Sequence, residues 1–297
     1  MSDPDFTSSA RVGTLVIHGV GLIGGSLGMA ARRRGLAREV VGVGRDQTRL
    51  EAAVRLGAID RYIVADDSPS IADACSGGDL IVLCTPVSHI VADLPAVLGA
   101  IGPGAVVTDV GSVKQVIVEA AEGDPRFVGS HPMAGSELAG VYAAKPELFD
   151  DAMWALTPTE TTSPEALACV RSFAQAVGAR TRIVPAAQHD EAVAITSHLP
   201  HVIAYALALL AAQRSCDNPS LPFLTAGSYT GATRVAGSLP SLWTDICRAN
   251  QASVSSALRD YRAALEAAQN AIDEGDWIEV GRLFDLGHEA RRNWPGR

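Results

Sequence analysis

Residues 12–184 alternate between short apolar segments and longer Ala-rich stretches of helical character. The apolar segments are nearly unbroken and are bounded by Gly, Pro or Asp, which is typical of strands buried on both faces of a sheet. Parallel strands need helical crossovers, and the Ala-rich stretches supply them. The pattern therefore predicts an α/β fold with a doubly wound parallel sheet. The expected strands are Val12–His18, Val40–Val43, Asp79–Cys84, Ala105–Thr108, Phe127–Gly129, Met153–Leu156 and Thr181–Val184.

The strand pattern ends near Pro185, and helical sequence follows it. The expected helices are Ala187–Arg214, Leu239–Asn270 and Ile272–Asn293. Pro200 lies inside the first of them, and we expect a kink there because proline removes a backbone hydrogen bond. The sequence therefore predicts an α/β domain over residues 12–184 and an all-helical second domain over residues 185–297.

Composition and charge argue against several classes of protein. Of the 297 residues, 47% are hydrophobic and 19% are charged, which is the composition of a globular protein rather than a disordered chain. With 24 Lys and Arg against 33 Asp and Glu, the net charge of −9 argues against a nucleic-acid partner. The longest apolar run, Val202–Ala212, is shorter than the ~20 residues that span a bilayer, so we expect no membrane partner.

The cysteines and the start of the chain indicate the compartment. Five cysteines are scattered without a CxxC pair, which favours reduced thiols over disulfides or a zinc ribbon. The first ten residues, MSDPDFTSSA, carry acidic residues where a signal peptide has a basic region. These features predict a cytoplasmic protein.

A glycine-rich turn follows the first expected strand and opens a helix. It reads Gly19-x-Gly21-x-x-Gly24. The first glycine allows the tight turn, the second lets backbone approach a pyrophosphate, and the third lets helix and strand pack closely. A plain strand–helix packing turn is the alternative, but the order of strand, turn, helix and second strand favours dinucleotide binding.

The end of the second expected strand bears on the choice between NAD and NADP. Gly44 occupies the position where an acidic residue would bind the ribose hydroxyls of NAD, and Arg45 follows it. A guanidinium suits the 2′-phosphate of NADP, so we favour NADP over NAD. Asp46, one or two residues late, leaves NAD or dual use open, and Arg45 as a plain surface charge is the other alternative. The predicted cofactor-binding residues are Gly19, Gly21, Leu22, Ile23, Gly24, Arg45, Thr85 and Pro86.

Three later segments carry chemistry beyond a generic dinucleotide domain. They are Thr108–Lys114, Gly129–Glu137 and Thr196–His201. Ligands of doubly wound sheets bind beyond the carboxyl ends of the strands, so Ser112 and His131 are both expected at the cofactor crevice. We expect the first helix of the second domain to close over them.

These segments resemble the prephenate/arogenate dehydrogenase family of tyrosine biosynthesis. The similar motifs are GVGLIGGS, TDVGSVK, GSHPMAGSE, WALTP from Trp154, SHLPH, and TRVA from Thr233 followed by Trp243. The resemblance extends over roughly residues 12–260. It implies oxidative decarboxylation of prephenate to 4-hydroxyphenylpyruvate, with hydride transfer to NAD(P)⁺. It also implies a homodimer formed through the helical domain, whose segment His201–Ala212 is apolar on too many sides for a solvated helix.

The resemblance assigns roles to individual residues. His131 would accept the hydroxyl proton, and Ser112 would bind and orient the same oxygen. Arg234 would bind a substrate carboxylate, and His201 would contact the substrate side chain. We also place His198 among the substrate-binding residues, and the alternative is that it bonds backbone freed by the kink at Pro200.

The same residues raise the question of a metal and of the substrate. His198 and His201 lie three residues apart, and Asp190 falls on the same side as His201, but no third ligand has a metal-like spacing, so we expect no metal. A neutral His201 can donate a hydrogen bond to the ketone of prephenate, which favours prephenate over arogenate. Asp190 weakens this preference, because it could reach the amine of arogenate through water.

The remaining residues and rival functions are less specific. Lys114 fits either a charge on a helix face or a groove residue near the cofactor, and Asp109 fits a loop-ordering residue. His18 fits a packing residue or a distant neighbour of the phosphates. A β-hydroxyacid dehydrogenase usually needs a lysine in the helical domain, and Ala186–Asn270 contains none. A non-catalytic NAD(P)-binding sensor is a more remote alternative.

Overall fold

The computed structural model describes residues 11–136 and 138–294. The acidic first ten residues and Glu137 of the GSHPMAGSE motif lie outside the described residues. The chain forms two compact units, which meet between Asn250 and Gln251. The first unit holds the sheet and the helices as far as Asn250, and the second holds the two helices α11 and α12. The predicted domain boundary at residues 184/185 lies within the first unit and stays a prediction.

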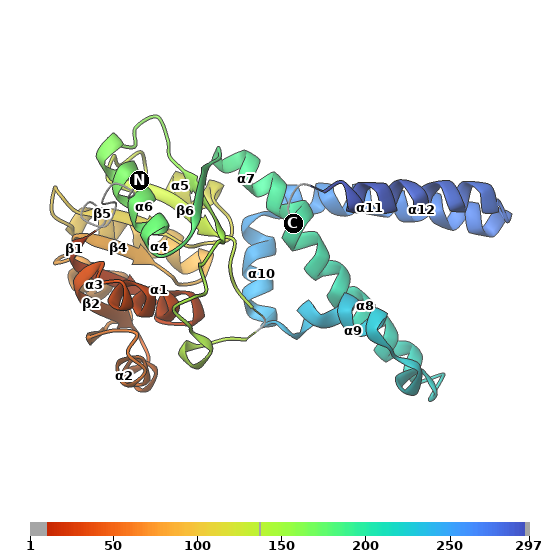
Figure 1. Ribbon diagram of the computed structural model, residues 1–297, viewed down its shortest axis with the longest axis horizontal. Coiled ribbons are helices and arrows are strands. Elements are labelled where there is room, and N and C mark those ends of the chain that lie inside the picture. The colour runs from red at the N-terminus through yellow and green to blue at the C-terminus, as the bar shows by residue number, and fades with distance from the viewer. Residues whose placement is uncertain (1–10, 137, 295–297) are drawn as a thin grey trace, which may run out of the picture. The chain divides into compact units, whose positions relative to one another are not determined.

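One eight-stranded sheet organises the first unit (Figure 1). Its strand order is β3-β2-β1-β4-β5-β6-β7-β8. The strands are β1 Val12–His18, β2 Ala37–Gly44, β3 Arg61–Val64, β4 Leu80–Leu83, β5 Val106–Asp109, β6 Phe127–Pro132, β7 Met153–Thr157 and β8 Arg180–Ile183. The helices between and beyond them are α1 Leu22–Arg33, α2 Gln47–Arg55, α3 Ser68–Cys75, α4 Val87–Ala100, α5 Gln115–Ala120, α6 Pro164–Ala176, α7 Ala186–Val193, α8 Leu199–Ser215, α9 Gly227–Thr233 and α10 Pro240–Ala249. The predicted doubly wound sheet followed by helices is confirmed.

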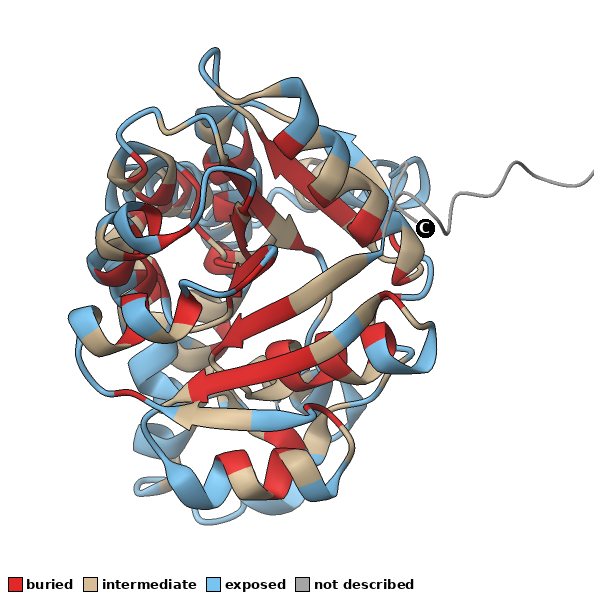
Figure 2. Cartoon of the chain, turned by 90° about the vertical axis from the view of Figure 1, so that its left-hand side faces the viewer, coloured by how far each residue is buried: buried red, intermediate tan, exposed pale blue. Residues whose placement is uncertain are grey.

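The central strands of the sheet are buried on both faces, as their apolar runs predict (Figure 2). The edge strands β3 and β8 are partly exposed. Leu15 and Ile17 on β1 contribute to one apolar cluster, while Val16 between them contributes to the other. This alternation follows from the two-residue repeat of a strand. The two clusters hold the strands rigidly, so the loops at their ends have fixed starting points.

Two strands differ from the sequence-based prediction. β3 is missing from the prediction because its four residues, Arg61–Val64, form a short edge strand without a buried apolar run. β7 pairs antiparallel with β6, whereas every other neighbouring pair is parallel. The described residues between β6 and β7 form only the short 3₁₀ helix η1, Val141–Ala143, and an antiparallel partner needs no helical crossover.

The long helix after the sheet is continuous but irregular. Between α7 and α8, residues Ala194–His198 form the π-helical turn η2, in which the Leu199 N–H donates to the Ala194 carbonyl. This turn comes immediately before Pro200, which has no N–H for a regular helical bond. The predicted kink at Pro200 therefore takes the form of a π turn.

The whole helical stretch Ala186–Ser215 has 30 residues, and its most apolar window has a mean hydropathy of 1.6 and is 28% buried. By length and composition alone it could cross a membrane. The expectation of no membrane partner rests on the run Val202–Ala212, which is shorter than this helix. The mostly buried core helix of a soluble protein passes the same test.

The expected helix Leu239–Asn270 is divided into two. α10 ends at Ala249, and α11, Gln251–Glu274, begins after the buried Asn250. In the second unit, α11 and α12, Trp277–Arg292, lie side by side (Figure 1). Gly275 connects them with a positive φ of 70°, a conformation that glycine adopts readily.

Candidate active site

The predicted cofactor-binding and catalytic residues meet at the carboxyl edge of the sheet. The glycine turn follows β1, Arg45 follows β2, Thr85 follows β4, and Ser112 follows β5. His131 lies near the end of β6, next to β5. The strand order reverses between β1 and β4, and such a switch point is where open α/β sheets bind ligands.

The glycine turn has the geometry that a pyrophosphate requires. Gly19 has a φ of +98°, and a Cβ at Gly24 would lie 2.2 Å from the Gly19 carbonyl oxygen. A Cβ at Gly21 would meet nothing within 4 Å, so this position is open. Gly21 is also the N-cap of α1 and brings no capping side chain, which leaves first-turn N–H groups for a phosphate. The turn fits a dinucleotide.

The residues around the glycine turn include a buried hydroxyl and an exposed arginine, which could both contact a dinucleotide. The buried hydroxyl of Thr85 has no hydrogen-bond partner within residues 11–136 and 138–294. Arg45 is exposed at the end of β2, and Asp46 caps α2 by accepting from the Arg49 N–H at 3.1 Å. His18 is buried beside Asp93, with 3.9 Å between Nδ1 and Oδ2, and burial lowers its pKa. These placements agree with a packing role for His18.

A buried ion pair supports the loop after β5. The Lys114 ammonium contacts the Asp109 carboxylate and donates to the Ser130 carbonyl oxygen at 2.8 Å. Asp109 also accepts from the Gly111 N–H at 2.7 Å and the Ser130 N–H at 3.0 Å. Burial lowers the pKa of Lys114, and Asp109 opposes that shift. Asp109 therefore orders the loop as expected. Lys114 is fully buried, so neither alternative for it, a helix-face charge or a groove residue, is correct.

His131 is partly exposed at the edge of the sheet and is bonded to a second histidine. Its Nδ1 lies 2.9 Å from Nε2 of His189, and His189 Nδ1 lies 2.8 Å from Oδ1 of Asp190. Desolvation holds the pKa of His131 well below its usual value, and the charges of His189, Lys114 and His198 lower it further. A neutral imidazole at pH 7 can accept a proton, as a general base must. Sequence reasoning did not single out His189.

Asp190 anchors α7 against the loop that carries Ser112. Its carboxylate accepts from the Lys114 N–H at 2.7 Å and the Gln115 N–H at 2.8 Å, where α5 begins. Asp190 is buried, and its oxygens are occupied by these bonds and by His189. The burial and the bonds of Asp190 therefore argue against both alternatives weighed for it, a water-mediated contact with an arogenate amine and a role as a metal ligand. Within the described residues, no group of three or more His, Cys, Asp or Glu could hold a metal ion.

His198 ends the π turn η2, and His201 lies three residues later on α8. His198 is buried, its Nδ1 lies 3.3 Å from the Asn250 amide nitrogen, and its Nε2 has no partner in the part of the chain that the structure describes. Burial lowers the pKa of His198 to about 4. His201 Nδ1 bonds the Ser197 carbonyl at 2.9 Å. The alternative role for His198 is a bond to backbone near Pro200. In the structure His201 makes that bond, to the Ser197 carbonyl.

An aromatic ring and an arginine flank His201. The indole of Trp243 stacks on the His201 ring, with 3.4 Å between ring centroids and 20° between planes. Arg234 lies at the start of the 3₁₀ helix η4, Arg234–Gly237, and is exposed. Burial lowers the pKa of His201, and the nearby Arg234 charge lowers it further. Arg234 and His201 therefore lie near each other, as two substrate-binding residues would.

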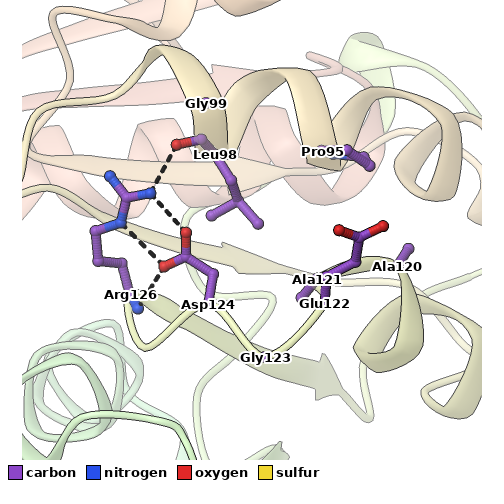
Figure 3. Close-up of a pocket in the computed structure, with 9 residues that line it drawn as sticks. All are labelled: Pro95, Leu98, Gly99, Ala120, Ala121, Glu122, Gly123, Asp124 and Arg126. Atoms are coloured by element: carbon purple, nitrogen blue, oxygen red, sulfur yellow. Dashed lines mark hydrogen bonds and ion pairs between the residues drawn. The ribbon is translucent and has the colours of Figure 1, made fainter.

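A separate pocket of about 330 Å³ lies away from these residues (Figure 3). Arg126 lines it, and its guanidinium is bonded to Asp124 and to the carbonyl oxygens of Leu98 and Ile101. The cation therefore stabilises the surrounding loop, and the pocket does not share the chemistry of the sheet edge.

A glycine turn at the switch point of a doubly wound sheet, with a neutral histidine at the same edge, defines a dinucleotide-dependent oxidoreductase. The comparisons with known proteins are more specific. The family model for the prephenate dehydrogenase nucleotide-binding domain matches residues 27–183, and the model for the prephenate dehydrogenase dimerization domain matches residues 185–286. The chain belongs to the prephenate dehydrogenase family.

Individual relatives cover most of the chain. It is 28% identical to prephenate dehydrogenase of Bacillus subtilis over 289 residues, which cover 96% of this chain and 76% of that protein. Synechocystis arogenate dehydrogenase is 34% identical, with a TM-score of 0.77 and coverage of 95% and 99% of the two chains. The Aquifex aeolicus prephenate dehydrogenase, solved in complex with hydroxyphenyl propionate and NAD⁺, is 29% identical, with a TM-score of 0.87 and coverage of 94% and 97%.

Proposed function

We propose that this chain oxidises and decarboxylates prephenate to 4-hydroxyphenylpyruvate in tyrosine biosynthesis, with His131 as the general base. The observation that supports this most strongly is the neutral His131 imidazole, held through Nδ1 at the edge where the glycine turn also lies. A nicotinamide dinucleotide held at the glycine turn would supply the hydride acceptor for the ring carbon that bears the hydroxyl.

The residues of the chain would divide the remaining work. His131 accepts the hydroxyl proton, and Ser112 orients the same oxygen from the loop after β5. Arg234 binds a carboxylate of the dianionic substrate. The ring carboxylate leaves as carbon dioxide, and the electrons of the broken C–C bond complete the aromatic ring. The ring oxygen then takes a proton back from His131 and becomes the phenol hydroxyl of the product. Aromatisation supplies the driving force, so this assignment needs no metal.

We favour NADP over NAD as the cofactor. Arg45 is exposed at the end of β2, where a 2′-phosphate would lie. Asp46, the alternative partner for the ribose of NAD, already accepts from the Arg49 N–H and pairs with the Arg49 guanidinium at 3.2 Å. A carboxylate used as a helix cap is less available to a ribose.

Arogenate is the second candidate substrate, and the geometry of His201 favours it. A carbonyl oxygen only accepts hydrogen bonds, so the His201 proton lies on Nδ1, toward Ser197. The Nε2 of neutral His201 then accepts and cannot donate to the ketone of prephenate. It could accept from the ammonium group of arogenate. The argument for prephenate from a neutral, donating His201 therefore fails, and prephenate rests on the family and on the site around His131.

The test is a two-by-two comparison of kcat/KM: prephenate or arogenate, with NAD⁺ or NADP⁺, followed by absorbance at 340 nm. We expect turnover of prephenate, with NADP⁺ preferred. A higher kcat/KM with arogenate would replace prephenate by the second candidate. In that case the His201→Val variant should lose the preference, because valine cannot accept from the ammonium group. Activity with neither substrate would contradict the proposed function.

A homodimer through the helical region is also part of this proposal, as is a cytoplasmic location. In the first unit, Leu209 and Leu210 on α8 and Phe223 in the 3₁₀ helix η3, Leu221–Leu224, are at least half exposed. In the second unit, Trp277 and Ile278 are 69% and 88% exposed. Exposed apolar side chains on this scale are typical of a large obligate interface. Sedimentation at micromolar concentration should show a dimer without detergent, and a stable monomer would contradict it.

A further inference from the structure

A hydrogen-bonded chain runs from the sheet edge into the helical part of the first unit. His131 lies on β6, and His189 and Asp190 lie on α7, almost 60 residues later in the sequence. The two distances are 2.9 Å between the histidines and 2.8 Å between His189 and Asp190. His189 and Asp190 are each 4% exposed, so water does not compete for these bonds.

The chemistry of the three groups fixes the direction of both bonds. An ionised carboxylate only accepts, so His189 carries its proton on Nδ1, toward Asp190. An imidazole that carries its proton on Nδ1 has its lone pair on Nε2, so His189 accepts from His131 Nδ1. The single proton of neutral His131 therefore lies on Nδ1, and its Nε2 keeps the lone pair that a general base uses.

We propose that His189 is a positioning residue, which holds His131 as the Nδ1–H tautomer so that Nε2 is the proton acceptor, with Asp190 fixing His189 in turn. Without such a partner, the imidazole is free to place its proton on Nε2, where the nitrogen cannot act as a base. The tautomer of His131 is a property of the protein alone. Only its catalytic consequence rests on the proposed function.

Asp190 gives this arrangement its rigidity. It binds the N–H groups of Lys114 and Gln115, and its backbone carbonyl accepts from the Asn250 amide at 2.8 Å. α7 is thereby fixed to the start of α5 and to the residue after α10. A partner that orients a catalytic histidine acts best when its own position is fixed in this way. Because Asp190 also caps α5, its substitution would disturb more than the tautomer, and His189 is the better residue to change.

The experiment compares His189→Leu with His189→Gln. Leucine fills similar space without a polar atom, whereas glutamine offers a carbonyl oxygen that can accept from His131 Nδ1. With prephenate and NADP⁺, we expect His189→Leu to lower kcat about 10²-fold, the lower end of a general-base contribution, with KM nearly unchanged. His189→Gln should keep kcat within about tenfold of the wild-type value. Equal losses in the two variants, or an unchanged kcat in His189→Leu, would overturn the proposal.

A measurement without substrate separates this inference from the proposed function. Histidine labelled with ¹⁵N gives different nitrogen shifts for the two tautomers, and the His131→Gln spectrum assigns the signal among the seven histidines. The wild-type protein should show His131 as the Nδ1–H tautomer, and His189→Gln should retain it. A wild-type Nε2–H tautomer would overturn the proposal. If the protein turns over neither substrate but shows the Nδ1–H tautomer, the proposed function fails and the positioning role stands.

Discussion

The glycine turn after β1 and the histidine cluster beside β6, formed by His131, His189 and His198, lie at the same edge of one sheet. Different parts of the chain build them. The turn is formed locally, because six consecutive residues, Gly19–Gly24, set its backbone path. The contacts that exclude larger residues come from the turn itself, from Ile17 on β1, and from Cys84 and Thr85, which follow β4. The cluster is assembled from distant segments, since His131 meets His189 only after the helical part packs against the sheet.

This difference teaches where each site is vulnerable. The turn needs space and free N–H groups, so an added methyl group is the change that damages it. The cluster needs charge balance and a fixed tautomer, so a change of polarity or pH damages it. Five predictions separate the two kinds of site.

The largest expected effect is that of His131→Ala. Loss of the general base should lower kcat about 10²–10⁴-fold with little change in KM. Steady-state kinetics on both substrates measures it, and His288→Ala, an exposed histidine in the second unit, is the control. An unchanged kcat would show that another group accepts the proton.

Arg234→Ala should mainly weaken substrate binding. Removing one partner of a desolvated ion pair costs about 2–5 kcal/mol, so KM should rise by about 30-fold or more. Arg234→Lys keeps the charge but not the planar fork, and its KM should fall between those of the wild type and the alanine variant. Isothermal titration with a product analogue checks the assignment, and wild-type affinity in Arg234→Ala contradicts it.

The cluster should also make stability depend on pH. His198 has a pKa of about 4 in the folded protein against 6.5 when unfolded. The unfolded chain therefore binds more protons between these values, and stability is lost as pH falls from 6.5 toward 4, by roughly 3 kcal/mol. Urea unfolding at pH 7.5 and pH 4.5 measures the loss. His198→Gln should reduce it, and equal pH dependence in both proteins would rule out this source.

On the other side of the comparison, Gly24→Ala should disturb the turn. The added Cβ would lie 2.2 Å from the Gly19 carbonyl, and overpacking of this kind costs about 1–3 kcal/mol. Gly21→Ala is the matched control, because its Cβ meets nothing within 4 Å. We expect thermal unfolding to show a lower Tm for Gly24→Ala only, while both variants bind the dinucleotide more weakly. A lower Tm for Gly21→Ala would mean that the turn is not open.

The smallest expected effect is that of Arg45→Ala on cofactor choice. Arg45 is exposed, and exposed charges contribute up to about 1 kcal/mol, so the ratio of kcat/KM for NADP⁺ to that for NAD⁺ should fall about fivefold. Arg55→Ala, which removes an exposed charge from the end of α2, should leave the ratio unchanged. An unchanged ratio in Arg45→Ala would make Arg45 a plain surface charge.

Much of the fold could be predicted because its signals are local. The apolar runs identified seven of the eight strands, and the glycine spacing located the turn. The antiparallel direction of β7 could not be predicted, because an isolated apolar run such as Met153–Leu156 carries no information about the direction of its neighbour. Asn250 as a helix break was also not apparent, since the break depends on the bond that its side chain makes to the Asp190 carbonyl.

The sequence by itself determined the doubly wound sheet, the helical region after it, the phosphate-binding turn and the candidate base at His131, since these depend on local patterns or on contiguous motifs. Only the tertiary structure decided which residue bonds Nδ1 of His131, and that Lys114 and Asp190 are buried and make structural bonds. The physical reason is that hydrogen-bond partners and desolvation depend on residues far apart in sequence. In the folded protein, Lys114 is buried in an ion pair with Asp109. The bond from His201 Nδ1 to the Ser197 carbonyl leaves Nε2 of a neutral His201 as an acceptor.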